Sequence, residues 1–157
     1  MAVFLSVKEL LSGAESAGLE LWEYVLRASA DETGISTERS WAQMSARLEA
    51  MKKADASYDA GMRSHSGLTG GDGAKMDAYA ASGGGICGEF IDGILAAALR
   101  MGECNACMHC IVAAPTAGAC GVLPAVLLPY GRRYELPEDA LIKALYVASG
   151  FGAVIAQ

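Results

Sequence analysis

The sequence of 157 residues is poor in basic charge and in histidine. Lys and Arg number 12 against 18 Asp and Glu, the formal net charge is −6, and the only basic doublets are Lys52-Lys53 and Arg132-Arg133. Nucleic-acid binding needs clustered positive charge that neutralises phosphates, so this pattern excludes a DNA or RNA role. With only His65 and His109 present, no Cys-His catalytic triad is indicated.

Strand-like alternation, a secretory signal and a clear membrane span are also absent from the sequence. Apolar residues instead recur at three- and four-residue spacing, which predicts a mainly α fold. The first residues lack a charged region followed by a long apolar segment, so we expect no membrane role and a cytoplasmic location. Residues 104–130 carry no Asp, Glu, Lys or Arg, but their prolines, glycines and His109 favour buried core over a span.

Helix signals cover most of the chain, and we expect one compact multi-helix domain over residues 1–157 with glycine-rich ligand loops. The longest predicted helix runs from Thr37 to about Met62, with an apolar stripe that suits packing within the domain or, alternatively, a partner helix. A polar turn is predicted over Gly131–Leu136. The other predicted helices cover about residues 7–12, 19–30, 74–81, 86–101, 103–114 and 122–128, and the last begins after Pro137.

A glycine-rich loop over residues 64–73 combines hydroxyls, an imidazole and four glycines. We predict that its backbone N–H groups bind a carboxylate, which a hydroxyl orients. The groups that would do this belong to Ser66, Thr69, Gly70, Gly71 and Gly73. The spacing fits neither a P-loop nor a dinucleotide fingerprint, which disfavours nucleotide binding. Asp72 as a simple helix cap is the alternative.

A second run of small residues lies at 113–121, Ala-Ala-Pro-Thr-Ala-Gly-Ala-Cys-Gly. Small side chains let a ligand approach the backbone, and a helix starting after Pro115 would direct free N–H groups at an anion. Close packing of two helices explains the same residues equally well. This segment is therefore a candidate ligand cradle that needs a second signal.

Four of the five cysteines lie between Cys104 and Cys120, and without a secretion signal we expect them to be reduced. Cys104-x-x-Cys107-x-x-Cys110 with Cys120 has the spacing of a ferredoxin [4Fe–4S] run. On a helix, however, this spacing rotates off one face, and free cysteine is among the most buried residue types. Core thiols are the favoured interpretation, and a small metal-binding helical module is the alternative.

Three segments together resemble the α chain of the iron–sulfur-dependent L-serine dehydratases, or L-serine ammonia-lyases. They are Ser66-Gly67-Leu68-Thr69-Gly70-Gly71-Asp72, then Glu103-x-Asn105-Ala106-x-Met108, then Ala113-Ala114-Pro115-Thr116-Ala117-Gly118-x-Cys120-Gly121-Val122-x-Pro124. The resemblance implies a lyase that converts L-serine to pyruvate and ammonia without pyridoxal phosphate. It implies a [4Fe–4S] cluster whose open iron polarises the serine hydroxyl while an unidentified base removes the α-proton.

The resemblance also implies where this chain touches the substrate. The implied contacts are Ser66, Thr69, Gly70, Gly71, Asn105, Thr116 and Gly118, with Cys120 near the cluster but not a ligand. The family's cluster-ligating cysteines follow the part seen here, so we expect the N-terminal half of the α-chain catalytic domain, without metal of its own and inactive alone.

The resemblance further implies partners for the chain. They are L-serine, the remaining part of the α chain and a β chain, and a homo-oligomer is left open. Two other functions remain as alternatives. One is the metal module built on Cys104, Cys107, Cys110 and Cys120, and the other is a non-catalytic helical interaction subunit.

Overall fold

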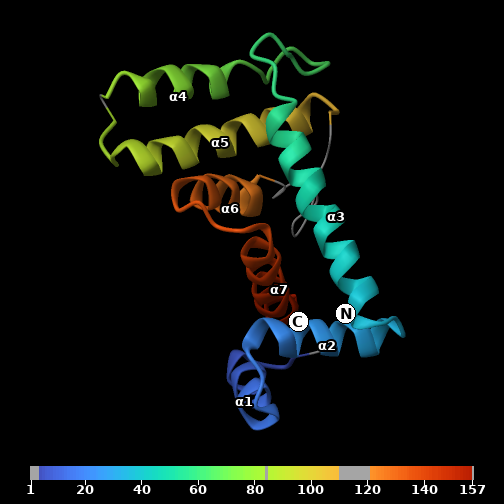
Figure 1. Cartoon of the computed structure of the whole chain (residues 1–157). Helices are drawn as coiled ribbons and strands as arrows, with labels where there is room; N and C mark the ends of the chain where they lie inside the picture. Colours follow the sequence, from blue (N-terminus) through green and yellow to red (C-terminus); the bar gives the residue numbers. More distant parts are fainter. Residues whose placement is uncertain (1–3, 84, 110–120, 157) are drawn as a thin grey trace. The chain divides into compact units, whose positions relative to one another are not determined.

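The structure, a computed structural model, describes residues 4–83, 85–109 and 121–156. Within these ranges it holds seven α-helices and no strand, which confirms the mainly α fold class (Figure 1). None of the described helices has both the length and the apolar character needed to cross a membrane. The helices are α1 (Val7–Ala17), α2 (Leu21–Thr33), α3 (Thr37–Ala56), α4 (Asp72–Ala81), α5 (Glu89–Ala106), α6 (Val122–Arg133) and α7 (Glu138–Ile155).

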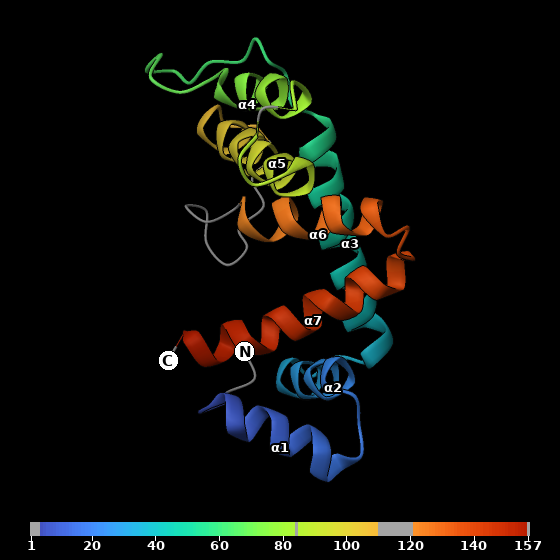
Figure 2. The ribbon, with the colours of Figure 1, turned by 90° about the vertical axis from the view of Figure 1, so that its left-hand side faces the viewer.

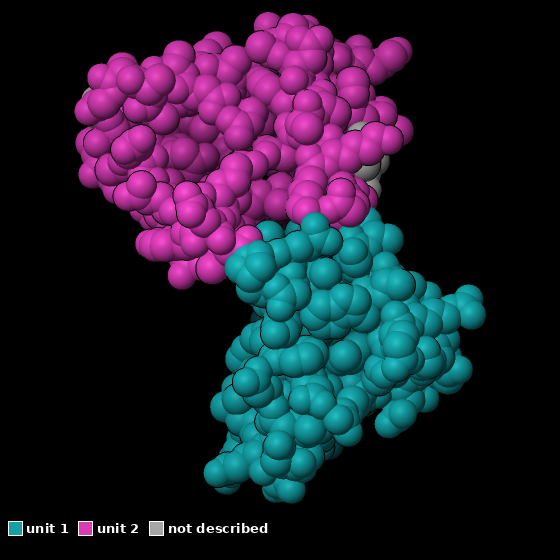
Figure 3. All heavy atoms as spheres, in the orientation of Figure 1, with its two compact units in different colours: residues 1–48, 137–157 teal, residues 49–136 magenta. Residues whose placement is uncertain are grey.

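The chain divides into two compact units, which Figure 3 colours separately. Unit 1 consists of Met1–Leu48 and Pro137–Gln157, and unit 2 consists of Glu49–Leu136. Unit 2 is therefore continuous in sequence and is inserted between the two pieces of unit 1. The boundary at residues 48 and 49 falls inside α3.

In unit 1, α7 packs on α1 and α2 around Gly150 (Figure 2). A Cβ atom at Gly150 would lie 2.7 Å from Val25 Cγ2 and 3.3 Å from Leu10 Cδ2, so the close approach depends on the missing side chain. Leu10, Val25 and Leu145 are all buried there. The core of unit 1 thus joins residues from both ends of the chain.

A buried polar contact adds α3 to the core of unit 1. The hydroxyls of Ser40 and Tyr146 lie 2.8 Å apart, and both residues are buried. The ring of Tyr146 stacks on Trp41 with a centroid separation of 6.2 Å, and Trp41 meets Trp22 edge-on at 5.8 Å. Each buried hydroxyl thus has a partner, as burial of a polar group requires.

In unit 2, α4 and α5 lie side by side and run in opposite directions, and α6 packs against α5 (Figures 1 and 2). Small and flexible side chains are buried in these helices. They are Ala96, Ala97, Met101, Ala125 and Leu128. Alanines in facing helices let the backbones approach closely. This pairing brings the start of α4 next to the end of α5.

Several predicted helix bounds were wrong. The first helix, predicted over about residues 7–12, continues to Ala17, where Gly18 provides the C-cap. The helix predicted over residues 37–62 ends at Ala56, because the Ser57 hydroxyl donates to the Ala54 carbonyl and the chain then turns. The helices predicted over 86–101 and 103–114 are joined in one helix, α5, which passes through Gly102. Burial of Met101 and Glu103 on either side outweighs the low helix propensity of this glycine. The polar turn predicted over residues 131–136 begins only after Arg133, because α6 continues to that residue. Arg132 and Arg133 in the last turn of α6 suit the negative end of the helix dipole.

Candidate functional site

A buried carboxylate, Glu103, joins the end of α5 to the start of α4. Glu103 is 3% exposed. Its Oε1 accepts hydrogen bonds from the N–H groups of Asp72 at 2.5 Å and Gly73 at 3.2 Å, and its Oε2 accepts one from the Tyr58 hydroxyl at 2.8 Å. The first N–H groups of a helix lack partners within the helix and carry partial positive charge, so a carboxylate stabilises them. Glu103 therefore caps α4 from a neighbouring helix.

Tyr58 completes the cap on α4. Its hydroxyl donates to Glu103 and accepts a hydrogen bond from the N–H of Ala74 at 2.9 Å. Burial, followed by the hydrogen bond to Glu103 and the charge of that carboxylate, raises the pKa of Tyr58 to about 12. The phenol is therefore protonated at neutral pH, as its role as a donor to Glu103 requires. We call Tyr58, Glu103 and the N–H groups of Asp72, Gly73 and Ala74 the α4 cap.

Close packing of α4 on α5 depends on a glycine at the second residue of α4. A Cβ atom at Gly73 would lie 2.8 Å from Arg100 Cγ and 3.0 Å from the Tyr58 hydroxyl oxygen. No larger residue fits there without moving these side chains. Gly73 thus lets the α4 cap form directly against α5.

Arg100 ties the pair of helices to the end of α3. It forms an ion pair with Asp77 of α4 and another with Asp55 of α3 at 3.5 Å, and Arg132 of α6 also reaches Asp55 at 2.8 Å. Burial opposes the charge of Arg100, but the two carboxylates outweigh it, so the pKa of Arg100 lies above its ordinary value. These contacts fix the helices that carry the α4 cap.

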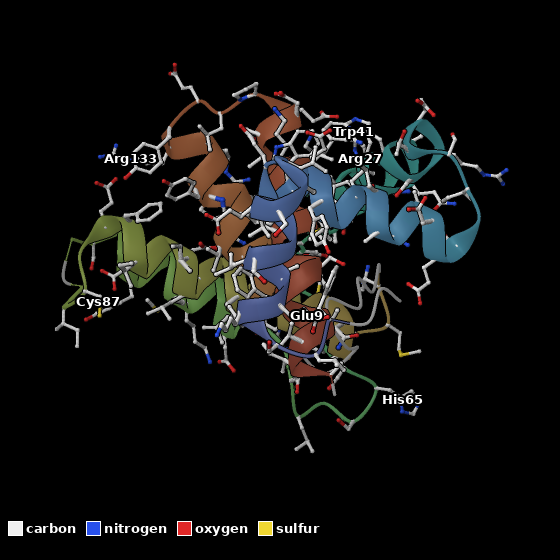
Figure 4. The ribbon with its side chains drawn as sticks, turned by 90° about the horizontal axis from the view of Figure 1, so that it is seen from below. Glu9, Arg27, Trp41, His65, Cys87 and Arg133 are labelled. Carbon is white, nitrogen blue, oxygen red and sulfur yellow. The ribbon has the colours of Figure 1, made fainter. Side chains whose placement is uncertain are left out.

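The glycine-rich loop before α4 is closed by its own hydrogen bonds. The N–H of Ser64 donates to the Thr69 carbonyl at 2.9 Å, and the N–H of Thr69 donates to Ser64 Oγ at 3.1 Å. Ser66 is exposed, with its Oγ 3.2 Å from Ser64 Oγ. His65 points away from the helices at the outer end of this loop (Figure 4). The loop is thus a defined turn whose tip faces solvent.

Two glycines connect this turn to α4 in conformations that other residues rarely adopt. Gly70 has φ 137° and Gly71 has φ 85°. A Cβ atom at Gly70 would lie 2.3 Å from the Met62 carbonyl oxygen, and one at Gly71 would lie 3.0 Å from a guanidinium nitrogen of Arg63. The Arg63 guanidinium is held there by donating to the carbonyls of Met62 at 2.6 Å and Ala60 at 3.2 Å. A cation therefore lies against the backbone of Gly71.

The structure brings two of the predicted substrate segments into one place. Gly70 and Gly71 lead into the α4 cap, whose carboxylate comes from Glu103, two residues before the half-buried Asn105. The N–H of Gly73, which we predicted to bind a ligand carboxylate, donates to Glu103 within the chain. Three further predicted residues, Thr116, Gly118 and Cys120, lie outside the described residues.

Sequence reasoning missed Tyr58, Glu103 and Arg63 as members of this site. Tyr58 fits the apolar spacing of the helix predicted over residues 37–62, and Glu103 stands out in the sequence only as part of a family motif. A signal for Arg63 was present, since it directly precedes the loop. No local pattern marks Glu103 and Tyr58 as partners, because 45 residues separate them.

The cysteines in the described residues do not form a metal site. Cys104 is 1% exposed and its Sγ lies 3.9 Å from the Ala54 carbonyl oxygen, while Cys107 is half-buried where α5 ends. No group of three His, Cys, Asp or Glu residues within the described ranges is placed to hold a metal ion. Cys110 and Cys120 lie outside those ranges. The cysteines among the described residues are therefore not arranged to hold an iron–sulfur cluster.

Comparison with known proteins identifies the family. The sequence profile described as "Serine dehydratase alpha chain" matches residues 16–157. The chain belongs to this family. The resemblance inferred from the three sequence segments is therefore confirmed, and no solved structure matches the chain.

This serine dehydratase α-chain member spans about half the length of one relative and matches smaller parts of two others. A probable L-serine dehydratase alpha chain of Bacillus subtilis (strain 168) is 32% identical over 155 residues, which cover 99% of this chain and 52% of the relative. The L-serine dehydratase alpha chain of Peptoniphilus asaccharolyticus is 38% identical over 79 residues, 50% of this chain and 27% of the relative. L-serine dehydratase 2 of Escherichia coli (strain K12) is 42% identical over 65 residues, 41% of this chain and 14% of the relative.

Proposed function

We propose that this chain forms part of the substrate site of an L-serine dehydratase, which converts L-serine to pyruvate and ammonia. One observation supports this most directly. Glu103 links the glycine-rich loop to the Asn105 segment, and these are two of the three segments that resemble the family. The chain spans about half the length of the Bacillus subtilis relative. We therefore assign the complete reaction to an assembly with the remaining part of the α chain and a β chain.

In this proposal the chain binds the carboxylate of L-serine at the glycine-rich loop. Gly70 and Gly71 let the Arg63 side chain lie directly against the loop backbone, and Arg63 supplies a guanidinium that matches the geometry of a carboxylate. Arg63 is exposed, so its guanidinium is accessible to a ligand, while Gly71 behind it is buried. The remaining proposed contacts are Ser66, Thr69, Asn105, Thr116 and Gly118.

Glu103 is a positioning residue in this proposal rather than the base that removes the α-proton. Both of its carboxylate oxygens already accept hydrogen bonds within the chain, three in all, so they are engaged in holding α4. Glu103 and Tyr58 instead hold the first turn of α4 and so set the direction in which Gly70 and Gly71 leave the loop. The residue that acts as base is not assigned.

A [4Fe–4S] cluster, when bound to the complete enzyme, would supply a Lewis-acidic iron that assists departure of the serine hydroxyl. We assign its cysteine ligands to the remaining part of the α chain. Loss of the α-proton and the hydroxyl leaves aminoacrylate, which hydrolyses to pyruvate and ammonia. The contribution of the present chain is to bind and orient L-serine for this loss, and we expect it to be inactive alone.

A chimeric enzyme tests this proposal. The matched part of the Bacillus subtilis α chain is replaced by residues 1–157 of this chain, and the product is expressed anaerobically with a β chain from the same organism. Pyruvate formed from L-serine is then measured. We expect turnover by the chimera and none by residues 1–157 alone.

Variants of the chimera test the proposed carboxylate site. Arg63→Gln should raise KM for L-serine more than it lowers kcat, whereas Arg39→Gln, at an exposed position on α3, should change neither. A folded chimera that contains iron and sulfide but produces no pyruvate would contradict the proposed function. Serine turnover by the isolated chain would contradict its inactivity.

A further inference from the structure

A cavity lies at the other end of the α4–α5 pair, away from the α4 cap. It has a volume of about 510 Å³ and is formed where α4 ends and α5 begins, with Ala80, Gly83, Gly85 and Asp92 in its wall. Asp92 and Glu103 are eleven residues apart on α5, which at 1.5 Å per residue places them roughly 16 Å apart. This cavity is therefore separate from the serine site proposed above.

Asp92 is the most unusual group in the wall of the cavity. It is 3% exposed, and no hydrogen bond or ion pair to its carboxylate occurs among residues 4–83, 85–109 and 121–156. No fully buried side-chain oxygen in those ranges lacks a partner, so the small exposed part of Asp92 includes its carboxylate. A buried carboxylate without a partner among the described residues is costly, and Asp92 lines this cavity.

A glycine in the wall lets the backbone lie directly against that carboxylate. A Cβ atom at Gly85 would lie 1.6 Å from Asp92 Oδ2, so any side chain at Gly85 would occupy the place of the carboxylate. Gly83, Gly88 and Gly93 also line the cavity and leave its backbone accessible. The wall is thus built from residues that present backbone and one acid rather than bulky side chains.

The charge of the wall selects a cation. Glu89, one turn before Asp92 on α5, supplies a second carboxylate, and no Lys, Arg or His is in the wall. The C-terminal end of α4, at Ala80 and Ala81, adds backbone carbonyls and the negative end of a helix dipole. A volume of about 510 Å³ exceeds what a bare metal ion needs, and the alanine walls suit a short hydrocarbon chain.

We propose that this cavity binds a small aliphatic amine, with a primary ammonium group paired to Asp92 and hydrogen-bonded to backbone carbonyls. Ammonium groups donate three hydrogen bonds and form charge-assisted bonds to carboxylates. Several wall residues, among them Gly83, Gly88 and Glu89, are exposed, so a ligand can enter from solvent near the turn where Figure 4 labels Cys87. The inference does not depend on serine turnover.

Titration of the chain of 157 residues with 1,4-diaminobutane tests the proposal. Amide chemical shifts are followed by NMR in about 150 mM NaCl, where screening beyond roughly 8 Å suppresses general attraction to an acidic surface. The neutral isostere 1,4-butanediol, KCl and MgCl₂ serve as comparison ligands. We expect saturable shifts at residues 80–93 with the diamine and none with the diol.

Variants assign the interaction to Asp92. Asp92→Asn should weaken binding of the diamine about tenfold, the loss of one charge-assisted contact, and Glu89→Gln about threefold. Asp31→Asn removes an exposed carboxylate from α2 and should leave binding unchanged. If the circular dichroism of Asp92→Asn shows loss of helix, Glu89→Gln carries the test, since Glu89 is exposed.

Three results would overturn the amine site. Shifts spread over all acidic positions would indicate non-specific attraction. Equal binding of the diol would remove the role of charge. Tighter saturation of the same residues by K⁺ or Mg²⁺ than by the diamine would indicate an inorganic cation site.

Discussion

Removal of the Glu103 carboxylate should release the start of α4. In Glu103→Ala the N–H groups of Asp72 and Gly73 and the Tyr58 hydroxyl all lose their acceptor. Each donor left without a partner costs about 1–3 kcal/mol, and Asp72 and Tyr58 have partial access to water, so we expect a total loss of about 3 kcal/mol. At about 1.4 kcal/mol per factor of ten, the opening of α4 becomes roughly 100-fold more frequent.

The conservative variant separates the hydrogen bonds from the charge. Glu103→Gln keeps an acceptor oxygen for the N–H groups and places an NH₂ group at Oε2, which can donate to the Tyr58 oxygen in place of the present bond. It loses the charge that favours the N-terminus of a helix, which is worth about 0.3–1 kcal/mol. We therefore expect about a fivefold increase in the opening of α4, far less than in Glu103→Ala. Glu49→Ala is the matched control, because Glu49 in the same unit makes only an exposed pair with Lys52 worth about 0.5 kcal/mol or less.

Hydrogen exchange measured by mass spectrometry is the suitable assay, because it reports on α4 itself. Tryptophan fluorescence would not serve, since Trp22 and Trp41 both lie in unit 1. Peptides that cover residues 72–81 should exchange faster in the order wild type, Glu103→Gln, Glu103→Ala. Equal exchange in wild type and Glu103→Ala, with unchanged circular dichroism, would refute the conclusion that Glu103 holds α4.

Four further changes test other parts of the structure. Gly70→Ala should lower the free energy of unfolding in urea by about 3 kcal/mol, because its Cβ would lie 2.3 Å from the Met62 carbonyl oxygen. Gly67→Ala is the control and should cost about 1 kcal/mol, since Gly67 has φ 73° but open space around it. Equal costs for the two variants would contradict this expectation. The pKa of Tyr58 is raised to about 12 from an ordinary 10, so its contribution to stability should be complete below pH 10 and lost between pH 10 and 12. The free energies of unfolding of wild type and Tyr58→Phe should therefore converge over that pH range. A difference that stays the same up to pH 12 would count against this role of Tyr58. Tyr146→Phe should cost about 1 kcal/mol, seen by Trp41 fluorescence in unit 1, through loss of the Ser40 hydrogen bond. Anaerobically purified chain should contain no stoichiometric iron or sulfide, and metal that disappears in Cys107→Ala would favour the metal-binding module.

The helical fold could be predicted because apolar spacing and local caps act within short stretches of sequence. Ser6 accepts from the N–H of Glu9, and Gly18 and Gly34 end α1 and α2 with positive φ, all from residues within a few positions. The end of α3 was misplaced because Tyr58 continues the apolar spacing of that helix while its hydroxyl binds Glu103 in α5. A contact that distant in sequence leaves no periodic signal.

The candidate site could be predicted in part. Gly70 and Gly71 were found because a run of glycines before a helix signals unusual backbone conformations, and both have positive φ. The cap on α4 was instead expected from Asp72 or from a bound ligand. The structure supplies it from Glu103 in another helix, a choice that depends on how α4 and α5 pair and not on the loop itself.

The insertion of unit 2 within unit 1 sets an order of events during protein synthesis. Every residue of unit 2 has been made once Leu136 is added, whereas unit 1 needs α7, which begins at Glu138. Because units fold as their residues emerge from the ribosome, the glycine-rich loop and the α4 cap form while α1 and α2 still wait for Gly150 to pack between them. Until then the apolar side chains of Leu10 and Val25 lack the surface around Gly150 that covers them in the folded unit.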